Sequence, residues 1–208
     1  MGSPMSGTCE LCRDELAKAR MAAHLIACAS AHDSGPRQER LIQVKVEAEG
    51  APEYWLYLEG RESATLQQVD LLLRQTWLEC CGHMSAFRIG RLEPAKPTAL
   101  GDVFRSKGLA FQYEYDFGST TALKGKVVAF RSGWMGRSAV RLLARNAALP
   151  WVCQQNCDHP ATLICPFCIH EGPSLFCKRH APSHPCAKEE VWLPVVNSPR
   201  MGVCGYTG

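Results

Sequence analysis

The sequence predicts an α+β protein in which a central sheet-plus-helix domain is flanked by small zinc-binding modules. Alternating apolar and polar segments surround one amphipathic helix, two regions combine closely spaced cysteines with histidines, and 46% of the 208 residues are hydrophobic. A chain of this length forms one or two domains. We expect an N-terminal zinc finger in residues 1–35, an α+β domain in 36–150, a two-zinc finger in 151–190, and a C-terminal segment, 191–208, that returns to the central domain.

The N-terminal finger is predicted from four residues. Cys9 and Cys12 form a C-x2-C knuckle, and the Ala- and Leu-rich stretch 14–29 predicts a helix that carries His24 and Cys28. Helix positions four apart lie on one face, so these two side chains can complete a zinc site with the knuckle. His32 is a less well-spaced substitute for His24, and the alternative is a small helix in which Cys28 is merely buried.

The central domain is predicted from periodicity and turn signals. A polar linker with Gly and Pro covers residues 31–40. Thr65 is expected to cap a helix with Gln68 as its capping-box partner, and the apolar residues of that helix recur at helical spacing as far as Trp77. Strands are expected at 41–47, 53–59, 86–91, 109–116 and 123–131, and a short turn or helix at 100–104.

A basic stretch follows, with no acidic residue between Asp116 and Asp158. We expect a helix within 137–149 that begins near Ser138 and places Arg141 and Arg145 on one face. This stretch is a candidate phosphate-binding surface for nucleic acid. The alternatives are a solvated face, or arginines that offset the negative charge of neighbouring zinc sites. The candidate phosphate-binding residues are Lys124, Lys126, Arg137, Arg141 and Arg145.

Residues 153–186 carry the strongest pattern, C-x3-C-x7-C-x2-C-x8-C-x2-H-x3-H-x-C. Eight ligands fill two tetrahedral zinc sites, and two histidines argue against a disulfide framework. In a cross-brace the first and third pairs share one ion, and the sequential alternative divides the ligands after Cys168. His159 and His170 lie outside the pairs. The eight ligands are Cys153, Cys157, Cys165, Cys168, Cys177, His180, His184 and Cys186.

The order of these ligands resembles the AN-one and B-box families of cross-brace zinc fingers, and the resemblance implies a protein-interaction module. The segments Phe87–Gly90, Leu100–Phe104 and Phe111–Gly118 are similar to the plasmid pRiA ORF-three-like family of transposon-passenger proteins, over about residues 40–130. Asn197–Tyr206 also resembles the ending of the finger-bearing members. This likeness implies an α+β fold with ubiquitin-like character and no established activity. Members usually continue with an Asp-Gly-Trp-x-His-like segment, which residues 119–122 lack.

The remaining cysteines, Cys80, Cys81 and Cys204, are expected to be buried thiols. Cys80 or Cys81 beside His83 is the best set for a cysteine nucleophile, but adjacent residues rarely converge on a substrate. No phosphate loop, nucleophile elbow or H-E-x-x-H run occurs, and a zinc saturated by protein ligands does not activate water. We therefore expect no catalytic residues.

The predicted function is a non-enzymatic, zinc-binding protein-interaction adaptor with three zinc ions per chain. Nucleic-acid binding through residues 124–145 is the alternative, and a cysteine-dependent enzyme is the least favoured. Twelve cysteines without a secretory signal predict a reducing, cytoplasmic location, and no apolar run is long enough to span a membrane. The formal net charge of +3 falls to near zero with three sites of three thiolates each, so overall charge does not argue for nucleic acid.

Overall fold

The computed structural model describes residues 5–33, 35, 38–189 and 192–208. The chain forms two compact units, one of residues 1–75 and 84–147 and the other of residues 76–83 and 148–208. Part of the predicted linker, at residues 34 and 36–37, lies outside the described residues, as does position 191 of the predicted C-terminal strand. The predicted α+β class is confirmed, with a large antiparallel sheet and few helices.

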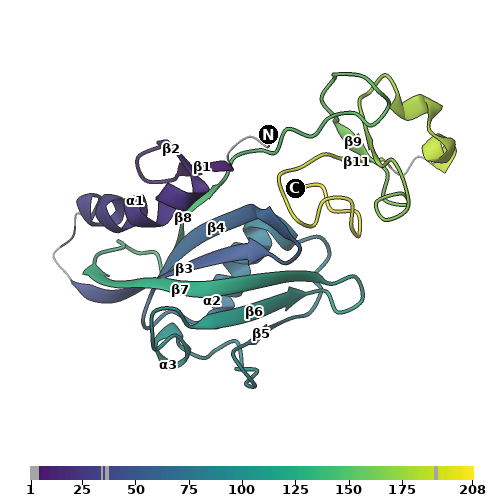
Figure 1. Ribbon diagram of the computed structural model, residues 1–208. Helices are drawn as coiled ribbons and strands as arrows, with labels where there is room; N and C mark the ends of the chain where they lie inside the picture. The colour runs from purple at the N-terminus through teal and green to yellow at the C-terminus, as the bar shows by residue number, and fades with distance from the viewer. Residues whose placement is uncertain (1–4, 34, 36–37, 190–191) are drawn as a thin grey trace. The chain divides into compact units, whose positions relative to one another are not determined.

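The first unit is built on an eight-stranded sheet with the order β2-β1-β8-β4-β3-β7-β6-β5 (Figure 1), in which every pairing is antiparallel. Its strands are β1 (Ser6–Cys9), β2 (Glu15–Ala17), β3 (Glu39–Ala48), β4 (Ala51–Arg61), β5 (Ser85–Arg88), β6 (Ala110–Tyr115), β7 (Thr121–Gly133) and β8 (Val140–Asn146). Its helices are α1 (Lys18–Ala31), α2 (Leu66–Leu73) and α3 (Leu100–Val103). The predicted strands at 41–47, 53–59, 86–91, 109–116 and 123–131 all correspond to strands of this sheet.

Helix α2 begins as the sequence predicts. The side chain of Thr65 and that of Gln68 form the reciprocal capping box, and the Gln68 Oε1 atom accepts the Thr65 N–H at 2.9 Å. Buried Asp70 then links the helix to β5 and β6, because it accepts hydrogen bonds from Tyr113 Oη at 2.7 Å and Ser85 Oγ at 2.6 Å. The helical turn that follows, Arg74–Leu78, is a π-helix.

The predicted helix within residues 137–149 is wrong, because this segment forms β8 between β1 and β4. Its Ala, Leu and Arg residues favour a helix locally. The sheet overrides that preference by burying Leu143 and Ala144 and by pairing Arg141 with Glu59 across the β4–β8 ladder.

The N-terminal segment is part of the sheet of the first unit, whereas the sequence predicts a separate finger. Strand β1 pairs with β8, so that Gly7 lies opposite Asn146. The six-membered ring of Trp55 lies against Gly7, where a Cβ atom would be only 2.4 Å from the ring. Met21 and Leu25 of α1 pack with Trp55 and Tyr57 in one buried cluster. A contact between positions 7 and 146 leaves no local signal in the sequence.

The second unit has a small three-stranded sheet with the order β10-β9-β11 and two 3-10 helices. Residues 191–208 are predicted to return to the central domain. The strand of this segment, β11, pairs with β9, whereas Ser198 and Arg200 contact Trp77 and Cys80. The buried residues Ala161, Ile164 and Leu175 pack with Leu193 and Met201 of the C-terminal segment. The elements are β9 (Leu163–Ile164), β10 (Leu175–Phe176), Ala181–Ser183, Pro185–Glu189 and β11 (Leu193–Pro194). Among the described residues, no helix is long and apolar enough to cross a membrane.

One buried carboxylate organises the middle of the large sheet. Glu59 on β4 has no exposed surface, and it accepts hydrogen bonds from Arg131 Nη2 at 2.8 Å, Arg141 Nη2 at 2.6 Å and Gln43 Nε2 at 2.9 Å. Burial raises the pKa of the Glu59 carboxyl, but the hydrogen bonds from Arg131 and Gln43 outweigh it, so the pKa lies below its usual range. Asp33 supplies a second carboxylate to Arg131.

Glu59→Gln should lower the free energy of unfolding of the first unit by about 3–5 kcal/mol, because it leaves two arginines without their buried partner. The matched control is Glu62→Gln, whose partner Arg40 is half exposed, and which should cost under about 1 kcal/mol. Because the folded-state pKa of Glu59 is depressed, its stabilisation is present above about pH 4.3, the unfolded value, and disappears as the pH falls through the lower folded value. Urea titrations of the wild type and both variants from pH 7 to pH 3 measure the free energy of unfolding. Equal losses of stability in the two variants, relative to the wild type, would contradict this role of Glu59.

Candidate metal centres

The cysteines of this chain occur in groups of three, each with one histidine. Four such groups exist among the described residues, and within each group the ligand atoms all lie within 4.8 Å of one another. All twelve cysteines lie in the described part of the chain, none forms a disulfide, and each belongs to one group. The groups are Cys9, Cys12, His24 and Cys28; Cys153, Cys157, Cys177 and His180; Cys165, Cys168, His184 and Cys186; and Cys80, Cys81, His83 and Cys204.

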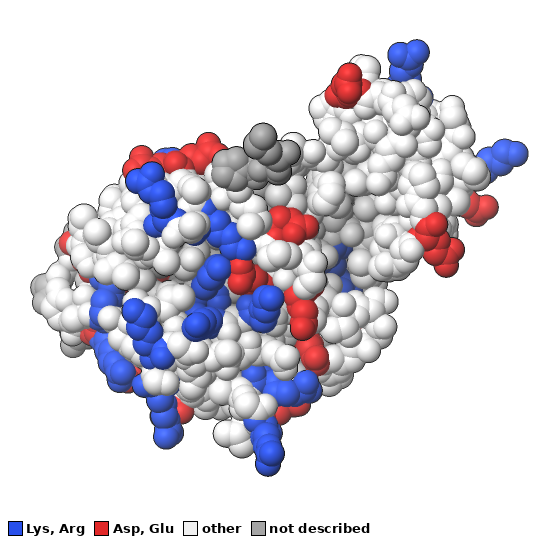
Figure 2. Space-filling model, in the orientation of Figure 1, with Lys and Arg blue, Asp and Glu red and all other residues white. Residues whose placement is uncertain are grey.

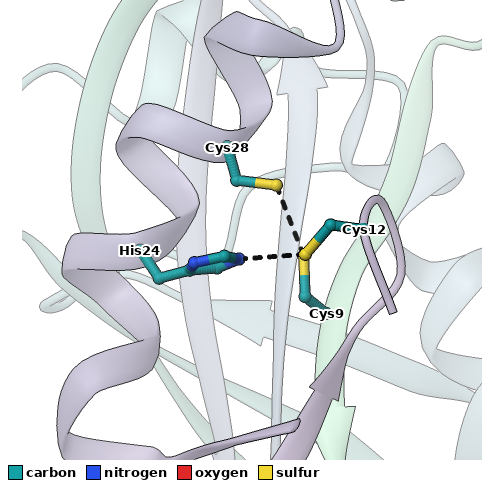
Figure 3. A group of neighbouring side chains, drawn as sticks. All are labelled: Cys9, Cys12, His24 and Cys28. Atoms are coloured by element: carbon teal, nitrogen blue, oxygen red, sulfur yellow. Dashed lines mark hydrogen bonds between the residues drawn. The ribbon is translucent and has the colours of Figure 1, made fainter. Parts of the chain in front are cut away.

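The N-terminal group lies where β1 ends against α1 (Figure 3). The knuckle from Cys9 is closed by two backbone hydrogen bonds, from Cys9 N to Asp14 O and from Arg13 N to Cys9 O, both 2.9 Å. Arg13 has a φ of 68°, a left-handed conformation that reverses the chain after Cys12. His24 and Cys28 project from one face of α1, one helical turn apart. The structure therefore brings together the four residues predicted for this site.

His32, the predicted substitute for His24, lies beside this group. Its Nδ1 atom is 2.8 Å from the carbonyl oxygen of Cys28 and 3.6 Å from Cys28 Sγ. His24 Nε2 is 3.4 Å from Cys12 Sγ and is the histidine of the four-residue group. The contacts of His32 are typical of a residue that closes the C-terminal end of α1.

The two groups in residues 153–186 divide the four ligand pairs as a cross-brace does. The first pair, Cys153 and Cys157, meets the third pair, Cys177 and His180, and the second pair meets the fourth. Strands β9 and β10 lie between the ligand pairs and hold them in this order. His159 and His170 are exposed and belong to neither group. The sequential division of the ligands is not the one that the structure shows.

A small aromatic cluster supports the second of these groups. The ring of His184 lies 4.6 Å from that of Phe176 and 5.5 Å from that of Trp192, measured between centroids. Phe176 is fully buried and packs with Cys165 and Ala181. Few other side chains in residues 153–186 are buried. Side chains that bind one ion would therefore supply much of the stability of this segment.

The spacing of the ligand atoms fits a tetrahedral ion. Zn–S bonds of about 2.3 Å and Zn–N bonds of about 2.0–2.1 Å place two sulfurs about 3.8 Å apart, and a sulfur and a nitrogen about 3.5 Å apart. In the N-terminal group the Cys9 and Cys28 sulfurs are 3.8 Å apart. In the cross-brace segment, residues 153–186 (the brace), Cys168 Sγ is 3.9 Å from Cys186 Sγ and 3.4 Å from His184 Nε2. Four N or S donors at these distances are suited to hold zinc.

The thiols of these groups are crowded. Burial, together with hydrogen bonds with Cys12 and Cys9, raises the pKa of the Cys28 thiol to about 12. Burial likewise raises the pKa of Cys168 to about 11, together with the neighbouring Cys165 and Cys186. A divalent cation between the sulfurs favours the thiolate form, as it does for any coordinating thiol. Three thiolates this close together repel one another when no cation is present. A tetrahedral zinc ion requires the same close arrangement of sulfurs.

Sequence reasoning missed the fourth group. Cys80, Cys81 and Cys204 are expected to be buried thiols, but Cys81 and Cys204 are exposed and Cys80 is partly exposed. Cys81 and Cys204 are separated by 123 residues, which hides their proximity in the sequence. The cysteine count carried the missing signal: after three groups of three cysteines and one histidine, three cysteines with a nearby His83 remain.

The predicted phosphate-binding residues are not one surface. Lys124 and Lys126 are exposed on β7, and Arg137 is exposed in the loop before β8. Arg141 is bound to Glu59 and also lies 3.7 Å from Asp33, so two carboxylates compensate its charge. Arg145 is partly buried on β8. One predicted alternative is that these arginines offset the negative charge of the zinc sites. Arg141 does not do so, because its charge is offset by carboxylates.

Comparisons with known proteins identify no family. No family model matches the chain, and no curated protein is similar to it. A solved structure, that of the protein of unknown function MM3350 from Methanosarcina mazei Go1, aligns with a TM-score of 0.43 and 17% identity. The alignment covers 51% of this chain and 69% of that one. Residue chemistry and geometry are therefore the basis of the functional proposal.

Cys28→Ser should release the metal of the N-terminal group and loosen α1, because it removes a buried ligand whose place no other cysteine can take. Amide exchange in residues 18–31 should rise by at least about tenfold, since loss of a zinc ligand removes well over 1.4 kcal/mol of local stability. His32→Ala is the matched control and should retain the metal. Mass spectrometry of the exchanged peptides measures both variants. Metal loss in His32→Ala would show that the wrong histidine has been assigned, and unchanged exchange in Cys28→Ser would contradict the site.

Proposed function

We propose that this protein is a zinc-stabilised protein-interaction adaptor without catalytic activity. The observation that carries the proposal is the donor set of each predicted site, three cysteine sulfurs and one histidine nitrogen. Four such donors fill the coordination of a structural zinc and leave no position for water or substrate. An ion of this kind holds a fold together and does not activate a nucleophile.

Zinc is the metal that these ligands favour. Thiolate and imidazole donors in a tetrahedral arrangement suit Zn2+, whereas Mg2+ and Ca2+ require oxygen ligands. Three thiolates and one Zn2+ give each site a net charge of −1, which reduces the basic excess of the chain. Zinc thiolates persist in reducing surroundings, in keeping with the proposed cytoplasmic location.

The brace offers two exposed apolar side chains for a partner. Phe167 lies between the ligands Cys165 and Cys168 and is 59% exposed, and Val152 precedes Cys153 and is 58% exposed. Both are held by chain segments that metal ligation would fix in place. Aromatic residues are enriched in the centres of protein interfaces. We propose a protein partner with an apolar pocket for Phe167, a use that the resemblance to AN-one and B-box fingers also implies.

Two finer assignments belong to the same proposal. The central sheet is assigned ubiquitin-like character, and the chain is placed with the plasmid pRiA ORF-three-like proteins. Both rest on the segments Phe87–Gly90, Leu100–Phe104 and Phe111–Gly118, the last of which forms β6 and the turn after it. Neither assignment implies an activity.

Phe167→Ser combined with Val152→Ser should reduce partner capture at least about tenfold while the zinc content stays unchanged, because a buried aromatic anchor contributes more than 1.4 kcal/mol to binding. Leu92→Ser is the matched control, since Leu92 is 71% exposed in the first unit. Quantitative cross-linking and mass spectrometry compare the three proteins. If the double variant captured the same proteins in the same amounts as the wild type, the proposed surface would be refuted.

Nucleic-acid binding is a second candidate because of one cavity on the large sheet. Lys45, Arg88, Lys124 and Lys126 line an open cavity of about 540 Å³ together with Phe111. Figure 2 shows Lys and Arg side chains gathered on one face of this unit. Ammonium and guanidinium groups at an open cavity suit contacts with phosphates.

If this cavity binds nucleic acid, Lys124→Gln with Lys126→Gln should weaken oligonucleotide binding and reduce the slope of log affinity against log salt by about 2, since each phosphate contact contributes about 1. Lys178→Gln with Lys188→Gln removes the same charge from exposed positions of the second unit. Fluorescence anisotropy at several salt concentrations measures the slopes. Equal slopes in both double variants would exclude this cavity.

A further inference from the structure

The fourth cysteine–histidine group lies within the second unit but joins two distant parts of the sequence. Cys80, Cys81 and His83 follow the π-helical turn after α2, and Cys204 lies four residues before Gly208. Both segments belong to the same compact unit. An ion held here would link the end of the helix to the C-terminal segment.

The distances within this group match those of the predicted sites. Cys81 Sγ lies 3.8 Å from Cys80 Sγ and 3.7 Å from Cys204 Sγ, close to the sulfur spacing of about 3.8 Å around a tetrahedral zinc. His83 Nε2 lies 3.0 Å from Cys81 Sγ and 3.2 Å from Cys204 Sγ, a few tenths of an ångström below the zinc value. All four ligand atoms lie within 4.8 Å of one another.

The backbone is bent to bring these ligands together. Gly82 has a φ of 80°, which turns the chain between Cys81 and His83, and its N–H is bound by Glu79 Oε1 at 2.6 Å. Cys204 itself has a φ of 50°. Only a few per cent of residues other than glycine adopt this left-handed conformation, and such residues gather at functional sites.

Buried contacts fix the C-terminal segment beside the ligands. Ser198 Oγ donates a hydrogen bond to Trp77 O at 2.6 Å and accepts one from Arg200 N at 2.9 Å. Arg200 has no exposed surface, and its Nε atom donates to Cys80 Sγ at 3.4 Å. A buried guanidinium beside a thiolate offsets the net negative charge of a three-thiolate zinc site.

We propose that Cys80, Cys81, His83 and Cys204 form a fourth zinc site, which holds the C-terminal segment and exchanges its ion more readily than the other three. Two of its ligands, Cys81 and Cys204, are exposed, whereas each of the other groups has two buried cysteines or one buried and three partly buried ligands. A competing chelator therefore reaches this ion first. Its loss loosens residues 203–208 around Cys204, while the buried contacts of Ser198 and Arg200 remain and the cross-brace keeps its metal.

Native mass spectrometry of the full chain, kept reduced, tests the site. The wild type should carry four zinc ions, and Cys204→Ser three. His170→Gln, which removes an exposed histidine of the same unit that belongs to no group, should carry four. Because Cys204→Ser could disturb the fold, Cys81→Ser provides a second exposed ligand variant with the same expected count of three.

Chelator competition tests the exchange. One of four ions should leave the wild type at least tenfold faster than the rest, and this fast phase should be absent from both cysteine variants. Amide exchange in residues 203–206 should rise with the same time course.

A count of three in the wild type and in both cysteine variants would overturn the fourth site and leave the proposed function intact. No retained zinc at all would remove the proposed function as well. Preferential alkylation of Cys81 in zinc-saturated wild type would also overturn the site, because it would identify Cys81 as a reactive thiol beside His83.

Discussion

The convergence of three sulfurs and one imidazole nitrogen on a single point is the constraint on which this structure depends. It recurs four times and uses every cysteine of the chain. A thiol pays little penalty when it is buried alone, but three thiolates together are stable only around a cation. In residues 153–186 the ligand-bearing segments are short, and few of the residues between the ligands are buried. An ion bound there would therefore supply order that a small hydrophobic core cannot.

The large sheet is stabilised in a different way. Trp55, Tyr57 and the apolar side chains of α1 form one of its buried clusters, and Glu59 binds two arginines at its centre. The N-terminal group combines both modes, because Cys9 and Cys28 belong to the same buried cluster as Trp55. The candidate metal-binding knuckle thus lies between β1 and β2, at one end of a packed sheet. The brace is built around the three-stranded sheet β10-β9-β11, and its Phe167 is exposed.

Local signals predicted much of this structure and failed where distant segments meet. The capping box of Thr65, the alternation in residues 109–116 and the ligand spacing from Cys153 onwards all depend on neighbours in sequence, and the structure places these elements as expected. The segment 140–146 favours a helix locally, but its neighbours in the sheet make it a strand. Cys204 meets Cys81 across 123 residues, which no spacing rule reveals.

X-ray absorption at the zinc edge of the fully loaded, reduced protein tests the central claim most directly, since it reports the donor atoms themselves. The account predicts an average shell of about three sulfurs at about 2.3 Å and one nitrogen at about 2.0–2.1 Å, with no water ligand. This average holds whether three or four sites are filled, because every site has the same donor set. A shell with oxygen donors, or with two sulfurs or fewer, would contradict saturated structural sites and restore an open, catalytic metal as an explanation.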